Sequence, residues 1–412
     1  MNIKILLIVI SLIVSAFADT SFSNKLNYFG NISASKLDSK GFDLNSYRHD
    51  SVNENLSLSP HSKVGAQWSY YNDVITFTAQ ALLKSNHNDY ELDVTWLNFK
   101  YDLNDNYAIR LGRIQTKVFL YSASLDIDYL QLWAKEPSEV YRLMPIRTFN
   151  GLEITYNKVF NDYHFQTSLV TLASNKDTYV NGTKNTESNL DVYNSSSLSL
   201  LFENATYTYK ASYSRSKANI NDDAATIAIA NGLAAYGYDV SRYTFEDRLI
   251  QVTSLGFQYR GDTFLFESEI AYSHSDGLLP SSLGAYAILG YKMNKFIPFV
   301  MYAENKNDKD YYNTSDIQVV DATSQSLKTA LDDTLYVHNF SQKTLSLGFK
   351  YNIDIGMALK VQVDRITSID YGSISSATVQ SIGYESVGSL SRDAGITDKA
   401  IYAFTMGLSF AF

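Results

Sequence analysis

The chain contains no cysteine among its 412 residues. Without cysteine there can be no disulfide bonds, and there is no thiol to which a lipid anchor could be attached. The six histidines show no spacing typical of metal ligands, so the sequence predicts no metal site and no cofactor. These absences exclude a disulfide-held secreted domain and a lipoprotein.

Long hydrophobic runs are also missing after the first eighteen residues. The N-terminus has a short positive start at Met1–Lys4, an apolar stretch over Ile5–Val14 and a small-residue cleavage site at Ser15–Ala18. This order predicts a secretory signal peptide over 1–18, cleaved to leave 19–412 as a single mature domain. The apolar stretch is too short for a helix that crosses a bilayer, and an uncleaved anchor is the alternative.

Aromatic residues are plentiful, with 32 Tyr and 22 Phe, although the mean hydropathy is slightly negative. A chain that is polar on average but rich in aromatic residues suits a membrane-spanning β-barrel. In such a barrel only every second residue of a strand faces lipid, so no single segment looks strongly apolar.

The last eleven residues alternate between large apolar and small or hydroxylated side chains. On a strand this alternation gives one apolar face and one small, wettable face. A soluble edge strand could show the same pattern, but a strand of this kind that ends in an aromatic residue resembles the closing strand of Gram-negative outer-membrane barrels. The resemblance implies an assembly signal, read by the barrel-assembly machinery, in Phe404, Met406, Leu408, Phe410 and Phe412.

Strand-like segments recur along the whole mature chain. The sixteen predicted strands are 26–36, 63–71, 74–84, 91–101, 106–114, 149–158, 163–173, 194–203, 205–216, 249–260, 262–274, 283–292, 295–304, 343–352, 355–367 and 400–412. Several alternate clearly, and 91–101 changes phase near Trp96, which suggests a β-bulge.

Short and long connections between these segments alternate. Seven are tight polar turns, and the eight longer ones are 37–62, 85–90, 115–148, 174–193, 217–248, 275–282, 305–342 and 368–399. Within the fifth, the Ala-rich residues 223–238 predict a short helix. The asymmetry is typical of outer-membrane barrels, with short periplasmic turns and long external loops. An even strand count also closes the sheet without a free edge, as lipid requires.

The sequence therefore predicts an all-β fold: a transmembrane antiparallel up-and-down β-barrel of sixteen strands, with fourteen or eighteen as alternatives. A barrel of this size leaves an aqueous channel, whereas one of about eight strands is filled by side chains. Charged residues in mid-strand are expected on the lumen wall, because they would be costly against lipid. These residues are Glu153, Lys210, Glu267, Glu269, Lys350, Lys360 and Asp364.

The third long connection, 115–148, is too apolar for a loop in free solvent. It carries Tyr121, Tyr129, Trp133 and Tyr141, which would be buried against the inner barrel wall. R-L-G-R at 110–113 is followed by L-Y-S, D-x-D-Y and P-S-E-V-Y, and this order resembles a group of proteobacterial porin-like proteins. The resemblance implies that 115–148 folds inward and narrows the channel, as the third external loop does in general porins.

If so, the constriction is lined from a mixed set of charges. The candidates are Arg110, Arg113, Lys117, Asp126, Asp128, Lys135, Glu136, Glu139, Arg142 and Arg147. Opposed acidic and basic side chains would orient dipolar solutes. The six basic and four acidic residues of this set favour anions, whereas the formal net charge of −9 for the whole chain favours cations. The alternative is that these residues pair with each other or with the wall and hold the loop in place.

No arrangement of residues indicates catalysis, so we predict that the protein is not an enzyme. The predicted function is passive diffusion of small hydrophilic solutes and ions through a porin in the cell outer membrane of a Gram-negative bacterium. Expected partners are outer-membrane lipid and lipopolysaccharide, the assembly machinery and two further copies in a homotrimer, but no nucleic acid. A substrate-specific channel and a barrel with a surface-binding or adhesion role are the alternatives.

Overall fold

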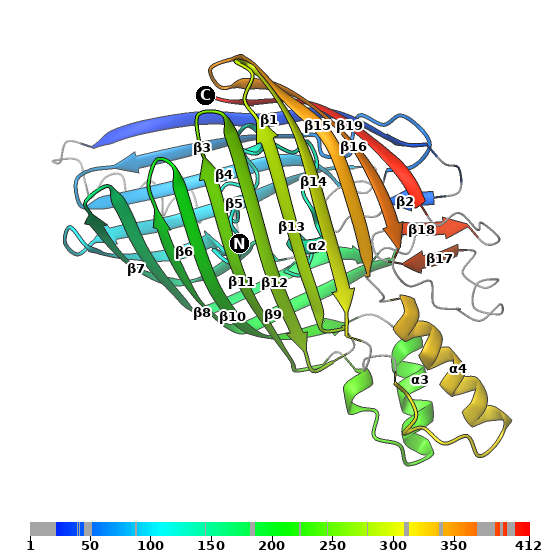
Figure 1. Ribbon diagram of the computed structural model, residues 1–412. Coiled ribbons are helices and arrows are strands. Elements are labelled where there is room, and N and C mark those ends of the chain that lie inside the picture. The colour runs from blue at the N-terminus through cyan, green and yellow to red at the C-terminus, as the bar shows by residue number, and fades with distance from the viewer. Residues whose placement is uncertain are drawn as a thin grey trace.

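Sixteen strands form one closed antiparallel barrel (Figure 1). The computed structural model describes residues 22–38, 40, 42–44, 52–86, 89–144, 146–181, 186–221, 224–244, 246–277, 279–308, 313–337, 341–368, 384–387, 390–393 and 400–412. The predicted signal peptide, 1–18, lies outside the described residues.

Each barrel strand pairs with its neighbours in the chain, and the last strand closes the ring against the first. The strands are β1 (Ser23–Leu37), β3 (Lys63–Tyr71), β4 (Ile75–Asn86), β5 (Asp89–Asp102), β6 (Tyr107–Gln115), β7 (Thr148–Phe160), β8 (Tyr163–Asn181), β9 (Thr186–Glu203), β10 (Tyr207–Asn221), β11 (Arg248–Arg260), β12 (Phe264–Ser275), β13 (Ser282–Tyr291), β14 (Phe296–Asn307), β15 (Gln342–Asp354), β16 (Met357–Ser368) and β19 (Ala400–Ala411). All sixteen predicted segments coincide with these strands, so the predicted fold class is confirmed. A separate small sheet pairs β2 (Phe42–Leu44), β18 (Leu390–Asp393) and β17 (Tyr384–Val387).

The C-terminal strand has the predicted alternation. Phe404 and Met406 are exposed on the outer face, whereas Ala403 and Thr405 are buried on the inner face. Backbone bonds in both directions between Tyr28 and Phe412, at 2.9 and 2.8 Å, continue the seam between β1 and β19 to the last residue. The role of this strand as an assembly signal stays a prediction.

The wall separates apolar from polar side chains strand by strand. On β15, Leu347 is 60% exposed on the outer face, whereas the neighbouring Ser346 is completely buried on the inner face. This is the alternation that a strand needs when one of its faces meets lipid and the other faces the barrel interior.

The seven short turns are confirmed, but two of the eight longer connections are not long. Strand β8 ends at Asn181, and β9 begins at Thr186. Likewise, β4 ends at Asn86, and β5 begins at Asp89. The prediction of long connections over 174–193 and 85–90 is therefore wrong. A strand that rises beyond the apolar layer needs no lipid-facing residues, so its sequence loses the alternation by which strands are recognised.

Irregular pairing hides further parts of these strands. Leu172 and Asn194 have positive φ values of 52° and 48°, and the register between β8 and β9 shifts between Val170 and Asn175. The predicted phase change in 91–101 is confirmed as a bulge, because Gln80 and Ala81 pair with Trp96 and Val94 and leave Thr95 as the extra residue. The Thr95 hydroxyl donates to Gln80 Oε1 at 2.6 Å, which keeps the bulged residue directed into the barrel.

Two helices lie side by side beyond the long-loop end of the barrel (Figure 1). The predicted helix is α3 (Ala224–Ala235), between β10 and β11, and an unpredicted helix, α4 (Ala322–Val337), lies between β14 and β15. Leu233, Leu331 and Leu335 are buried in this helical pair. None of the helices in the described part of the chain is long and apolar enough to cross a membrane.

Asp321 caps α4 and links it to α3. Its Oδ1 accepts the Ser324 backbone N–H at 2.7 Å, and the Tyr236 hydroxyl donates to its Oδ2 at 2.9 Å. The Ser324 N–H and the Tyr236 hydroxyl both favour the charged carboxylate and lower the pKa of Asp321. The cap therefore stabilises α4 above the usual pKa of an aspartate and is lost as the pH falls through the lowered value.

We expect Asp321→Ala to make the backbone amides of 322–337 exchange with solvent several-fold faster at pH 6, because the helix loses its cap. As the pH falls through the lowered pKa of Asp321, the wild-type rate should approach that of the variant, since the wild-type carboxyl becomes protonated. The measurement is the ratio of the two exchange rates at each pH, in which the intrinsic pH dependence of exchange cancels. A ratio that does not change with pH would contradict this assignment.

Candidate pore constriction

The segment between β6 and β7, residues 116–147, lies inside the barrel and is called the inner loop below. It contains a 3-10 turn, η1 (Asp128–Leu130), and one short helix, α2 (Ser138–Tyr141), which contacts β12, β13 and β14. Figure 1 shows α2 within the ring of strands.

Aromatic side chains form the core between the inner loop and the wall. The Trp133 ring packs edge-on against Tyr121 and Tyr286, with ring centroids 5.0 and 5.7 Å apart. Tyr141 is completely buried beside Trp133 and Phe119. Because Tyr286 belongs to β13, Tyr121, Trp133 and Tyr141 are buried against the barrel wall as expected, whereas Tyr129 is only half-buried, under the Lys350 ammonium.

The first part of the inner loop is bound to β10, β11 and β12 through its backbone. The hydroxyls of Ser212 and Ser254 both donate to the Val118 carbonyl, at 2.7 and 2.6 Å. Lys210 donates to the Phe119 carbonyl. Glu269 accepts the Leu120 N–H at 2.8 Å. Charged wall residues thus bind backbone groups that no secondary structure would otherwise satisfy.

Tyr121 extends this attachment with its side chain. Its hydroxyl donates to Glu267 on β12 at 2.6 Å and accepts a bond from Gln258 at the same distance.

The middle part of the inner loop is bound to β15 and β16. Lys350 donates to the Tyr129 carbonyl, and Lys360 donates to the carbonyls of Asp128 and Trp133. Lys135 forms an ion pair of 3.1 Å with Asp364.

Gln362 holds the backbone next to that ion pair. Its Oε1 accepts the Ala134 N–H at 2.8 Å, and its Nε2 donates to Asp364 Oδ1 at 2.7 Å.

Helix α2 is held at Glu139. The carboxylate accepts bonds from Gln342 and Thr344 on β15, and its backbone carbonyl accepts one from Asn305 at 2.9 Å. Gly284 on β13 makes this approach possible, since a Cβ there would lie 2.1 Å from the Glu139 carbonyl oxygen. Only glycine lets two backbones come this close.

The remaining predicted constriction residues form ion pairs near the two ends of the inner loop. Arg147 binds Asp126 at 2.7 Å and Glu136 at 3.0 Å. Arg110 binds Glu153 at 2.8 Å, and Lys117 contacts the same carboxylate. The structure thus brings these charges together in pairs.

Asp128 and Arg113 each pair with a residue that the sequence did not single out. Lys63 on β3 lies 3.1 Å from Asp128 and ties the inner loop to the wall on its far side. Arg113 lies 3.4 Å from Asp93 on β5. Gly112, with a φ of 127°, precedes Arg113 and gives β6 a backbone conformation that other residues rarely adopt. Arg142 lines a cavity described below.

All seven predicted wall residues contact the inner loop instead of facing open water, and each is at most 9% exposed. A group of half-exposed charges lies on β4, β5 and β6. They are Lys84, Asp93, Lys100, Asp102, Arg110 and Arg113, whose side chains are 23 to 31% exposed. The inner loop therefore covers the arc from β7 through β16 to β3 and leaves the β4–β6 wall accessible.

Sequence reasoning missed Lys63, Asp93, Lys100 and Asp102. The bulge at Thr95 obscures the phase of β5, and Lys63 is the first residue of its strand, where alternation carries no information. Within the described residues, no group of three His, Cys, Asp or Glu side chains could hold a metal ion.

No family model matches the chain, and no curated protein matches its sequence. Solved structures do match its fold. The anion-selective porin from Comamonas acidovorans is 9% identical, with a TM-score of 0.53, over 95% of this chain and 100% of that one. The outer membrane channel DcaP of Acinetobacter baumannii is 11% identical, with a TM-score of 0.52, over 94% and 97%.

A third match is OmpT, an outer membrane protein of Vibrio cholerae, in its trimer form. It is 10% identical, with a TM-score of 0.51, over 95% of this chain and 100% of that one. At these identities the likeness concerns the fold: the chain is a porin-like barrel of sixteen strands.

Proposed function

We propose that this chain is an outer-membrane porin of a Gram-negative bacterium, through which small hydrophilic solutes and ions diffuse passively and in which no reaction is catalysed. The observation that carries the proposal is the placement of the inner loop. It is fixed inside a sixteen-strand barrel along one arc of the wall, and the charged β4–β6 wall stays accessible opposite it. A narrowed passage between two polar surfaces is what a diffusion pore requires.

The outer face of the barrel supports a membrane location. Large apolar side chains are exposed there on strand after strand, as with Leu283 on β13 and Leu347 on β15. In water such a surface would be costly, whereas in a bilayer it is solvated by lipid tails.

Aromatic pairs lie near the short turns. Tyr163 stacks on Phe202 with ring centroids 4.3 Å apart, and Phe264 packs on Tyr291 at 5.2 Å. Aromatic rings prefer the interface between lipid and water, so these pairs mark the periplasmic edge of the barrel. The outer-membrane location presupposes export through the signal peptide at 1–18, and it makes lipid and lipopolysaccharide the surroundings of the barrel.

The test is planar-bilayer conductance of the refolded mature chain under a salt gradient. We expect stepwise openings with a conductance of nanosiemens scale, which is the behaviour of a water-filled pore. If the openings occur in groups of three, the proposed homotrimer is supported, as the trimeric form of the similar OmpT barrel suggests. Folded protein without conductance would overturn the porin proposal and favour a closed barrel with a surface-binding role.

The accessible β4–β6 wall sets the ion preference in this proposal. Four basic residues, Lys84, Lys100, Arg110 and Arg113, outnumber three acidic ones, Glu91, Asp93 and Asp102, among its accessible charges. A fixed excess of positive charge at a narrow point raises the local concentration of anions.

Replacing Lys84 and Arg113 together by glutamine should therefore shift the reversal potential toward cations and lower the chloride-to-potassium permeability ratio about twofold. Lys295→Gln is the matched control, because Lys295 lies in the short turn between β13 and β14 and donates to the Ile353 carbonyl. If the reversal potential shifted equally in the double variant and in the Lys295→Gln control, the β4–β6 wall would not line the conducting path.

A further inference from the structure

A cavity lies between the end of the inner loop and the wall formed by β7, β9, β10, β11, β12 and β13. It contains about 930 Å³ of space free of atoms, including solvent at its mouth. Several lining residues, such as Ser216, Ile250 and Ser275, are close to the long-loop ends of their strands, so the cavity lies on the proposed external side of the constriction.

Its lining is unlike the rest of the barrel interior. Ten of the sixteen lining residues are apolar, five are serines and one is charged. Phe149, Leu190, Val192 and Val252 are inward-facing strand residues that are at most 5% exposed, and Met144 covers them from the inner loop. Inward positions of a water-filled barrel are normally polar, so an apolar sector here needs its own explanation.

The contact between loop and wall accounts for part of this sector but not for the cavity. Leu190, Val192, Val252 and Met144 belong to the same buried cluster as the core of the inner loop. A contact that served only to fix the loop would be packed without gaps, because each unfilled apolar volume costs stability. The open space therefore suits an apolar group that enters from outside.

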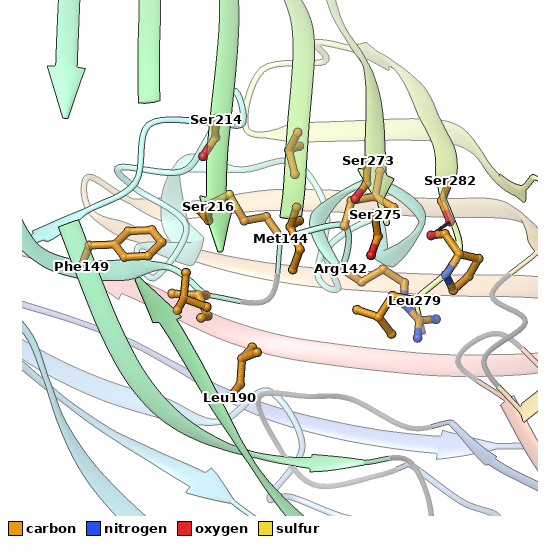
Figure 2. Close-up of a pocket in the computed structure, with 16 residues that line it drawn as sticks. Arg142, Met144, Phe149, Leu190, Ser214, Ser216, Ser273, Ser275, Leu279 and Ser282 are labelled. Carbon is orange, nitrogen blue, oxygen red and sulfur yellow. Dashed lines mark hydrogen bonds between the residues drawn. The ribbon is translucent and has the colours of Figure 1, made fainter. Parts of the chain in front are cut away.

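The charge at the cavity has one sign. Arg142 is the charged residue among the described lining residues, and none of them is acidic. In Figure 2, Arg142 and Leu279 lie on one side of the cavity and Phe149 on the other, with Ser273 and Ser275 near the arginine. A guanidinium flanked by hydroxyls recognises a carboxylate, and the remaining surface recognises a hydrocarbon chain or ring.

We infer that this cavity is a binding site for amphipathic monocarboxylates, that is, small molecules with one carboxylate and an apolar tail. The carboxylate binds at Arg142, and the tail lies between Met144, Phe149, Leu190 and Val252. The inference rests on the proposed function, since such solutes would bind at this site before they diffuse through the constriction.

The test is calorimetric titration of the refolded full mature chain, kept in amphipol so that no detergent tail competes for the cavity. The probe is octanoate. Octylammonium has a similar tail with the opposite charge, and acetate has the carboxylate without the tail. We expect one octanoate per chain, bound at least about tenfold more tightly than either control.

Two variants separate the parts of the site. Val192→Thr combined with Val252→Thr keeps the shape of both side chains but replaces two apolar methyl groups by hydroxyls, and should weaken octanoate binding about tenfold. Val300→Thr makes the same exchange on the outer face of β14, where Val300 is 40% exposed, and should leave binding unchanged. Arg142→Gln should weaken octanoate but not octan-1-ol, which has the tail without the charge.

Octanoate binding no tighter than that of acetate or octylammonium would overturn the inference, and so would unchanged binding in the double valine variant. Conductance measured in parallel separates the two proposals. A chain that conducts but does not bind octanoate would remain a porin without this site. A chain that binds octanoate but does not conduct would have the site without being an open pore.

Discussion

Replacing Gly284 by valine should detach α2 from the barrel wall. The new side chain would overlap the Glu139 carbonyl oxygen, which a Cβ at this position would approach to 2.1 Å. The position of the Cβ is fixed by the backbone of β13, and the Glu139 oxygen is a backbone atom, so neither can turn aside. The inner loop must then move and give up the bond from Asn305 to the same carbonyl.

Overpacking of this kind costs about 2 kcal/mol, which corresponds to roughly thirtyfold faster amide exchange over 137–143. Open-channel current should also become noisier, because the loop that narrows the lumen is no longer fixed. Exchange measured by mass spectrometry and single-channel recording test the two effects.

Gly290→Ala is the matched control for this variant. It also adds a side chain to the inner face of β13, but its Cβ would meet the end of the flexible Leu132 side chain at 3.1 Å. The leucine can adjust, so exchange over 137–143 should stay close to the wild-type rate. If the valine variant behaved like this control, the close contact between β13 and α2 would be refuted.

The second large effect is expected at the ion pair between Lys135 and Asp364. Both side chains are nearly buried, with 9 and 1% exposed. Asp364→Ala leaves the lysine ammonium without its partner inside the barrel and should lower the free energy of unfolding by about 3 kcal/mol. Urea unfolding of the refolded protein, followed by tryptophan fluorescence, measures this loss.

Two further variants test the electrostatic explanation. Combining Lys135→Met with Asp364→Leu removes both charges and should recover most of the stability, because no buried charge is then left alone. Lys217→Ala breaks an exposed pair with Asp247, in which the two side chains are 39 and 58% exposed, and should lower the stability far less than Asp364→Ala does. A double variant as unstable as Asp364→Ala would show that packing, not charge, explains the loss.

The strands of the barrel could be predicted because lipid imposes a simple rule on them. Where a strand crosses the apolar layer, as β15 does, every second residue is apolar, and the alternation can be read directly. The rule ends where the strand leaves that layer. The outer ends of β8 and β9 therefore resemble a loop in the sequence, and α4 is not predicted from the sequence between its flanking strands.

The inner loop illustrates a different limit. Its aromatic residues favour packing against the inner wall of the barrel, but they do not indicate which arc of the wall it covers. That choice depends on contacts between residues far apart in the chain, such as Lys360 with Trp133 and Lys63 with Asp128. Charged wall residues consequently looked like parts of an open lumen, although in the structure they hold the loop.

The seam between β1 and β19 governs the order in which the barrel can form. Phe29 pairs with Ala411, so the pairing that completes the ring joins the first and the last strands of the barrel. Until the last strand is delivered, β1 and β16 both present unsatisfied edges, and a partly translated or truncated chain stays an open sheet prone to pair with other chains. Contacts of such long range form slowly. We therefore expect closure of the barrel to come late in folding, and the chain to be most prone to association with its copies before that step.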